Sequence, residues 1–133
     1  MTEHANATDG TMSVVDDEVL LRRVHSKQIR PDGSLTSAAF NDRQLSVHRE
    51  LFRSRRDIQA AFPKHAIAEF TAGEARSVAD VDPDPLPEDI SHALVLCRGV
   101  TQSGLDRFST TLKRFASAHW NPSEHLPSIQ TES

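Results

Sequence analysis

Short apolar runs of strand length, separated by turn-forming residues, constrain the fold of this chain more than any other feature. Four of them lie near residues 19–25, 45–47, 65–70 and 92–99. The first run carries Arg22, Arg23 and His25 among apolar residues, and the third sets Glu69 between apolar neighbours; both have the length and composition of strands. The last run, HALVLCRG, is apolar on both faces, so we expect it to be the innermost strand of the sheet.

Helix signals stand between and after these runs. Ser54 and Thr71 occupy positions that suit N-caps, and Glu74 completes a capping box with Thr71. A longer amphipathic helix is expected over residues 103–119, where apolar residues recur at steps of three and four. We therefore predict a single α/β or α+β domain with a mixed sheet of about four strands, two short helices and one long C-terminal helix.

Polar, aperiodic ends flank the 133-residue chain. We predict a disordered tail over residues 1–16, one domain over residues 17–120 and a second disordered tail over residues 121–133. The proline-rich acidic stretch at residues 80–90 is expected to be an exposed loop within the domain. The turn that contains Pro31 and Gly33 should follow the first strand.

The compartment is inferred from what the sequence lacks. Cys97 is the single cysteine, so no internal disulfide forms, and no apolar run reaches the length of roughly 18 residues that a membrane span needs. The N-terminus has no basic and apolar leader pattern. We expect a cytoplasmic protein without membrane contact and without a cofactor.

Charge is distributed unevenly along the chain. Residues 19–56 hold nine Lys and Arg against three Asp and Glu, whereas residues 57–90 hold two against eight. The basic block predicts a surface for a protein partner, and its candidate contact residues are Arg49, Arg53, Arg55 and Arg56. The alternative is that the two blocks pack against each other. Nucleic-acid binding is not expected, because the net charge is −4 and aromatic residues are few.

Candidate catalytic residues come from the same strands. Arg23 and His25 share one face of the first strand, where a guanidinium and an imidazole suit an anion and a proton transfer. Glu69 lies on a strand between apolar neighbours and needs a partner, for which Arg23 is the first choice. Arg23 and Glu69 therefore form either a structural ion pair or part of a site. Ser37 is a further candidate, although no G-x-S-x-G turn presents a serine nucleophile.

Metal binding is not predicted. The seven histidines show no H-x-H, H-x-x-x-H or Cys–His spacing. We interpret them as surface or strand-end side chains.

Two resemblances add context. The segments PDG, SAAF, LSV and AEFTAG resemble a group of small bacterial proteins of unassigned function, over about residues 20–100. This resemblance implies a bacterial cytosolic domain and no particular activity. The order of Arg23 or His25, Ser37 and Glu69 is similar to that in compact ADP-ribosyltransferase-like folds, although their second Glu, Ser-Thr-Ser motif and aromatic wall are absent.

The sequence leaves two functions open. The first is a binding or accessory module that acts through a protein partner. The second is a small enzyme with an Arg/His/Glu cleft, of the ADP-ribosyltransferase-like kind. The oligomeric state is not indicated.

Overall fold

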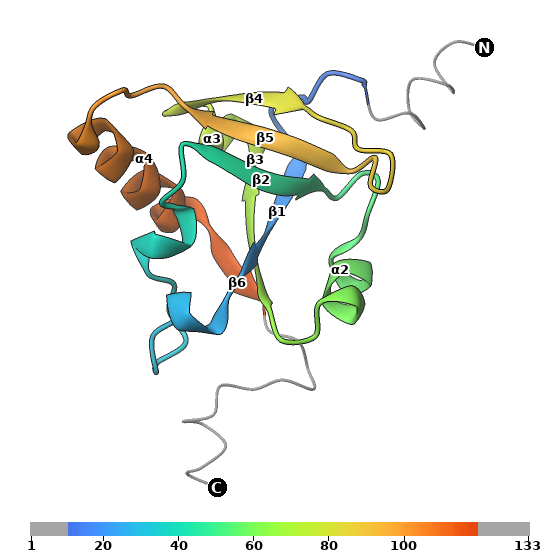
Figure 1. Cartoon of the computed structure of the whole chain (residues 1–133), viewed down its shortest axis with the longest axis horizontal. Helices are drawn as coiled ribbons and strands as arrows, with labels where there is room; N and C mark the ends of the chain where they lie inside the picture. The colour runs from blue at the N-terminus through green and yellow to red at the C-terminus, as the bar shows by residue number, and fades with distance from the viewer. Residues whose placement is uncertain (1–10, 120–133) are drawn as a thin grey trace, which may run out of the picture.

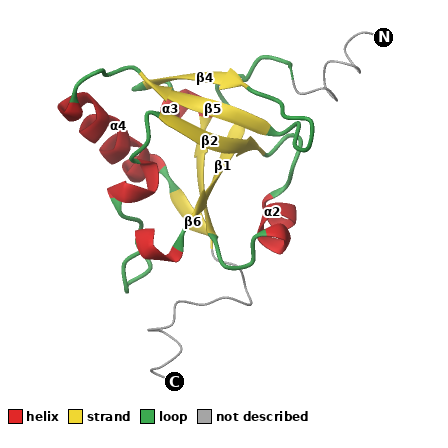
Figure 2. Ribbon diagram, in the orientation of Figure 1, coloured by secondary structure: helices red, strands yellow, loops and turns green. Residues whose placement is uncertain are grey.

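The computed structural model describes residues 11–119, in which the strands form one antiparallel sheet in the order β4-β5-β2-β1-β3-β6 (Figure 1). The strands are β1 (Val19–Val24), β2 (Gln44–Arg49), β3 (Ala66–Thr71), β4 (Ala79–Pro83), β5 (His92–Cys97) and β6 (Ser117–His119). The α-helices are α2 (Arg55–Ala61), α3 (Ala72–Ala75) and α4 (Gln102–Phe115), and two short 3-10 helices are η1 (Ser26–Gln28) and η2 (Ser37–Phe40). The domain is therefore α+β, with three α-helices in the described range (Figure 2).

The sheet differs from the prediction in size and in strand direction. Six strands pair where about four were expected, and every pair is antiparallel rather than mixed. β4 lies in the stretch expected to be a loop: Ala79 and Val81 are buried, whereas Asp80 and Asp82 face solvent. The acidic residues and prolines of that stretch masked this alternation.

The main core lies between one face of the sheet and the helices α3, α4 and η2. Leu20 and Val24 of β1 pack there with Phe40 of η2 and with Phe108 and Leu112 of α4, all with no more than 1% of their surface exposed. The amphipathic pattern predicted α4 correctly but extended it to residue 119. The helix ends at Phe115, and the following residues form β6.

The prediction that the run at residues 92–99 is the innermost strand is wrong. β5 is second from the sheet edge, between β4 and β2. Its Ala93 and Val95 are buried in the main core, but Leu94 and Leu96 on the opposite face are only partly buried. The reason is that the opposite face has much less cover.

Among the helices of residues 11–119, α2 is the one that packs on that opposite face. Ile58 of α2 and Phe62 after it pack on Leu21 of β1 and Ile67 of β3. Ser54 caps the helix by accepting from the backbone N–H of Asp57, as predicted. Since this small cluster covers only β1 and β3, the same face of β2 and β5 is left open beside α2.

Residues 11–16 are packed against the domain rather than forming a tail. Val14 is 3% exposed in the main core, and Arg76 donates to the carboxylate of Asp16 and to the Val14 carbonyl. The domain therefore begins before residue 17. The predictions for residues 1–10 and 121–133 concern positions outside the described residues.

Local signals around the strands are confirmed. β1 lies within the run of residues 19–25 that predicted a strand. Gly33 in the following turn has φ of 91°, a conformation that glycine adopts without strain. The Thr71 hydroxyl accepts from the Glu74 backbone N–H, and the Glu74 carboxylate accepts from the Thr71 backbone N–H, so the capping box forms.

Candidate functional site

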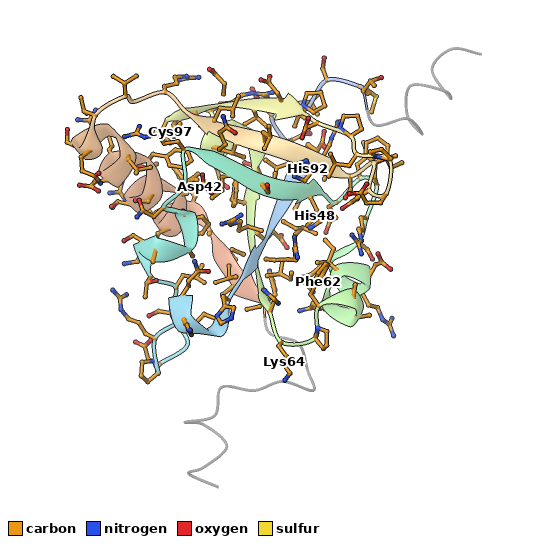
Figure 3. All side chains as sticks on the ribbon, in the orientation of Figure 1. Asp42, His48, Phe62, Lys64, His92 and Cys97 are labelled. Atoms are coloured by element: carbon orange, nitrogen blue, oxygen red, sulfur yellow. The ribbon has the colours of Figure 1, made fainter. Side chains whose placement is uncertain are left out.

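A polar cleft of about 210 Å³ lies on the open sheet face beside α2. Its lining side chains come from β1 and the turn after it, from β2, from β5 and from the start of β3. They are Arg22, Arg23, His25, Gln28, Ser46, His48, His65 and His92. Figure 3 labels His48 and His92 on neighbouring strands and Phe62 near α2. The cleft thus gathers two arginines and four histidines.

The floor of the cleft opens where β1 leaves β2. Only Leu20 and Leu21 of β1 pair with β2, and the two strands then diverge, as Figure 1 shows. The Arg22 side chain bridges the gap: its Nη1 donates to the Ser46 carbonyl at 3.0 Å and its Nε to the Ala39 carbonyl at 3.2 Å. Burial lowers the pKa of Arg22, Asp42 opposes this, and Arg23 adds to it. Arg22 holds the strands together at their point of separation.

Arg23 points to the other side of β1 and stacks on an aromatic ring. Its guanidinium carbon lies 3.9 Å from the centroid of the Phe62 ring, a cation–π contact. Partial burial and the nearby Arg53 lower its pKa, and Asp89 opposes them. No oxygen of the described residues accepts a hydrogen bond from this guanidinium, and no carboxylate forms an ion pair with it. Its N–H donors are therefore available in the cleft.

The predicted ion pair between Arg23 and Glu69 is wrong. Both residues lie on the same sheet face, but the register places Arg23 opposite Ile67 and Glu69 opposite Leu21. Glu69 Oε1 instead lies 3.2 Å from His119 Nε2 and 3.5 Å from Arg55 Nη1. The 3.2 Å approach lacks hydrogen-bond geometry, since this buried Nε2 has no hydrogen-bond partner among the described residues. Glu69 therefore belongs to a different cluster from Arg23.

His48 is the most buried titratable group of the cleft, with 5% of its surface exposed. Its Nδ1 lies 3.0 Å from Asp89 Oδ2 and 3.1 Å from the Ser91 hydroxyl. Burial lowers the pKa of His48 to about 4; Asp89 opposes this, whereas Arg23, Arg53 and His92 add to it. The ring is therefore neutral at pH 7.

Asp89 orients His48. The carboxylate accepts from Arg53 Nη1 at 3.1 Å and from both the hydroxyl and the backbone N–H of Ser91. Burial raises the pKa of Asp89, but the Ser91 hydrogen bonds, together with the nearby His48 and Arg53, outweigh it, so that its pKa is lowered. An ionised Asp89 accepts the proton of His48 Nδ1, which leaves Nε2 with its lone pair.

Three further histidines complete the walls. His92 is the cross-strand neighbour of His48, and its Nδ1 lies 2.9 Å from Asp84 Oδ2. His25 and His65 contact each other edge to face, with ring centroids 5.7 Å apart. Burial lowers the pKa of His65, and Arg23 and His25 add to this shift.

The structure gathers some of the predicted catalytic candidates and separates others. Arg23 and His25 line the cleft, as their shared face indicated. Ser37 begins η2, and it is not among the lining residues. Glu69 lines a separate surface cleft of about 720 Å³ with Arg55 and Arg56. The residue order that resembles ADP-ribosyltransferase-like folds is therefore not assembled into one site.

The four arginines predicted to contact a partner have different surroundings. Arg49 is fully buried, where its guanidinium binds both carboxylate oxygens of Glu18, so it has no surface to present. Arg53 binds Asp57 and Asp89, and Arg55 binds Glu69 and His119. Arg56 is exposed and has no ion pair with the described residues.

Sequence reasoning missed the histidine group. The histidines were interpreted as surface or strand-end side chains, so a shared site for His48, His65 and His92 was not predicted. The available signal was alternation: His48 lies one position from the apolar Val47, which places it on the face opposite the main core.

Neither a metal site nor a membrane span is found in the described range. No group of three or more His, Cys, Asp or Glu side chains there has a geometry that holds a metal ion. No helix within residues 11–119 combines the length and the apolar character needed to cross a bilayer.

Comparison with known proteins gives no match to a family model, to a curated protein or to a solved structure. The function of the cleft must therefore be argued from its own chemistry. The resemblance to small bacterial proteins stays an expectation.

Proposed function

We propose that this protein is a small ligand-binding domain that holds an anionic group in the polar cleft where β1 and β2 separate. One observation carries the proposal: the Arg23 guanidinium lies half-buried against Phe62 and finds no acceptor among the described residues. A cation in such surroundings gains most from a ligand that supplies the missing oxygens. Stacking on the ring holds the planar fork in place before the ligand arrives.

The surroundings of Arg23 favour an anion over a cation. Arg22 and Arg53 add positive charge, and Asp89 is already engaged by His48, Ser91 and Arg53. Phosphate and carboxylate groups match a guanidinium fork, because two oxygens accept two parallel N–H bonds. The cleft volume of about 210 Å³ is below the roughly 300–1,000 Å³ of drug-sized pockets. It therefore suits one anionic group, with the remainder of the ligand outside.

The test is calorimetric titration with inorganic phosphate at pH 7 and low ionic strength. We expect saturable binding to the wild-type protein and at least a ten-fold weaker affinity for Arg23→Gln. The matched control is Arg56→Gln, which removes an exposed arginine that does not line the cleft. The absence of phosphate binding to the wild type, or equal losses in both variants, would overturn the proposal.

A second candidate function is favoured by the arrangement of His48. An imidazole that donates Nδ1–H to a buried carboxylate and leaves Nε2 open has the arrangement of a general base. An enzyme that acts on a bound phosphate ester would use His48 to take a proton from water. Turnover of p-nitrophenyl phosphate by the wild type, lost in His48→Gln, supports this function, and equal rates with and without protein eliminate it.

The protein-partner hypothesis stays a prediction. Of the four arginines predicted to contact a partner, Arg56 is the one that is exposed and makes no ion pair with the described residues. The basic surface that a partner could contact is therefore smaller than the charge pattern of the sequence suggested. Affinity capture with Arg56→Glu beside the wild type tests it.

A further inference from the structure

The cleft pairs hydrogen-bond donors with one well-defined acceptor. Arg23 offers N–H groups, whereas His48 offers the lone pair of Nε2. This Nε2 makes no hydrogen bond with a described residue, and it is not closed off from solvent. An anion that sits against Arg23 therefore meets an acceptor as well as donors.

The tautomer of His48 follows from its partners. Asp89 Oδ2, 3.0 Å from Nδ1, also accepts from Arg53 and has no proton to give. The Ser91 hydroxyl donates to Asp89 Oδ1, so toward His48 it acts as an acceptor. Both neighbours of Nδ1 therefore require the ring proton there, and Nε2 is left unprotonated.

We propose that His48 makes the cleft selective for a phosphate group that carries a proton, as phosphate or a phosphate monoester, over sulfate and carboxylates. This inference rests on the proposed function, since it concerns the anion held by Arg23. A phosphate monoanion has a P–O–H that donates to His48 Nε2 while its other oxygens accept from Arg23. Sulfate and carboxylates have no proton near pH 7, so one of their oxygens would face the lone pair of Nε2.

The charges around His48 maintain this selectivity. Arg53 shares the Asp89 carboxylate with His48, Arg23 lines the same cleft, and His92 is the cross-strand neighbour of His48. Burial is the largest cause that opposes protonation of His48, and Arg23 and Arg53 add to it, whereas Asp89 favours protonation less strongly. His48 therefore does not readily become a second donor for a fully ionised anion. Leaving an acceptor without its donor in a buried site weakens binding by about ten-fold or more.

The experiment compares inorganic phosphate, sulfate and acetate by titration calorimetry at pH 6.5 and constant ionic strength. We expect the wild type to bind phosphate at least ten-fold more tightly than sulfate or acetate. His48→Gln should bring the phosphate-to-sulfate ratio close to one, because the Gln amide presents either a donor or an acceptor. The matched control is His119→Gln, which removes a histidine that does not line the cleft and should keep the wild-type ratio.

The possible outcomes separate the two proposals. Equal affinity of the wild type for phosphate and sulfate, lost in Arg23→Gln, overturns the selectivity and leaves the anion site standing. No binding of either anion overturns the anion site itself. If thermal melting shows that His48→Gln does not fold, the comparison of the three anions on the wild type still decides, because it needs no variant.

Discussion

Acidification should destabilise the protein through His48, and replacing this residue should remove that part of the loss. In the unfolded chain, the imidazole has its ordinary pKa of 6.5, whereas in the folded protein burial lowers the pKa of His48 to about 4. Between these two values the unfolded state binds a proton that the folded state does not. The free energy of unfolding therefore falls as the pH falls from about 6.5 towards 4.

The magnitude follows from the two pKa values. Integrating the proton linkage from pH 7 to pH 5 gives a loss of about 2 kcal/mol from His48 alone. The full loss below pH 4 approaches about 3 kcal/mol, at 1.36 kcal/mol for each pKa unit. Losses from His65 and from acidic groups that do not contact His48 occur in the wild type and in a His48 variant alike, so they cancel in a comparison.

Urea unfolding at pH 7 and at pH 5 measures this difference. His48→Gln keeps an N–H donor for Asp89 but cannot titrate, so we expect its free energy of unfolding to fall by about 2 kcal/mol less than that of the wild type. His25→Gln serves as the control, because it removes an exposed histidine of the same cleft and leaves the contacts of His48 with Asp89 and Ser91 in place. Equal losses in all three proteins would refute the buried, neutral state of His48.

Three further predictions concern the frame of the domain, each measured by urea unfolding at pH 7. Glu18→Ala leaves the fully buried Arg49 without its carboxylate and should lower the free energy of unfolding by about 3–5 kcal/mol; a loss below 1 kcal/mol would contradict the buried ion pair. Gly33→Ala places a Cβ at φ of 91° and should cost about 1 kcal/mol, and an unchanged stability would mean that the turn relaxes freely. Thr71→Ala removes the side-chain acceptor of the capping box and should cost about 1 kcal/mol, whereas a neutral result would assign the start of α3 to packing alone.

Local features of the fold were predictable because short segments determine them. The Ser54 cap, the Thr71 capping box and the turn at Gly33 each depend on residues within four positions of one another. β4 was not predictable in the same way. Its two aspartates and its neighbouring prolines resemble a loop, and pairing with β5 makes it a strand.

The candidate site was predictable only in part, because alternation gives the face of a residue but not the register of its strand. Period-two spacing correctly placed Arg23 and Glu69 on one face. A shift of two residues between β1 and β3 preserves that face, and it determines whether these side chains meet. The observed register puts Ile67 opposite Arg23, and Phe62 provides the aromatic surface on which its guanidinium stacks.

Two consecutive arginines on β1 have opposite directions and therefore different roles. Arg22 faces the seam where β1 separates from β2, and it donates to the backbone carbonyls of Ala39 and Ser46. Arg23 faces the cleft that this separation opens, and it has no acceptor in the described residues. The hydrogen bonds of Arg22 connect the two strands where they separate, and the N–H donors of Arg23 remain available to a ligand in the resulting cleft. The divergence of β1 from β2 thus explains why two adjacent arginines stand in an otherwise apolar strand. The same divergence opens a cleft in the sheet.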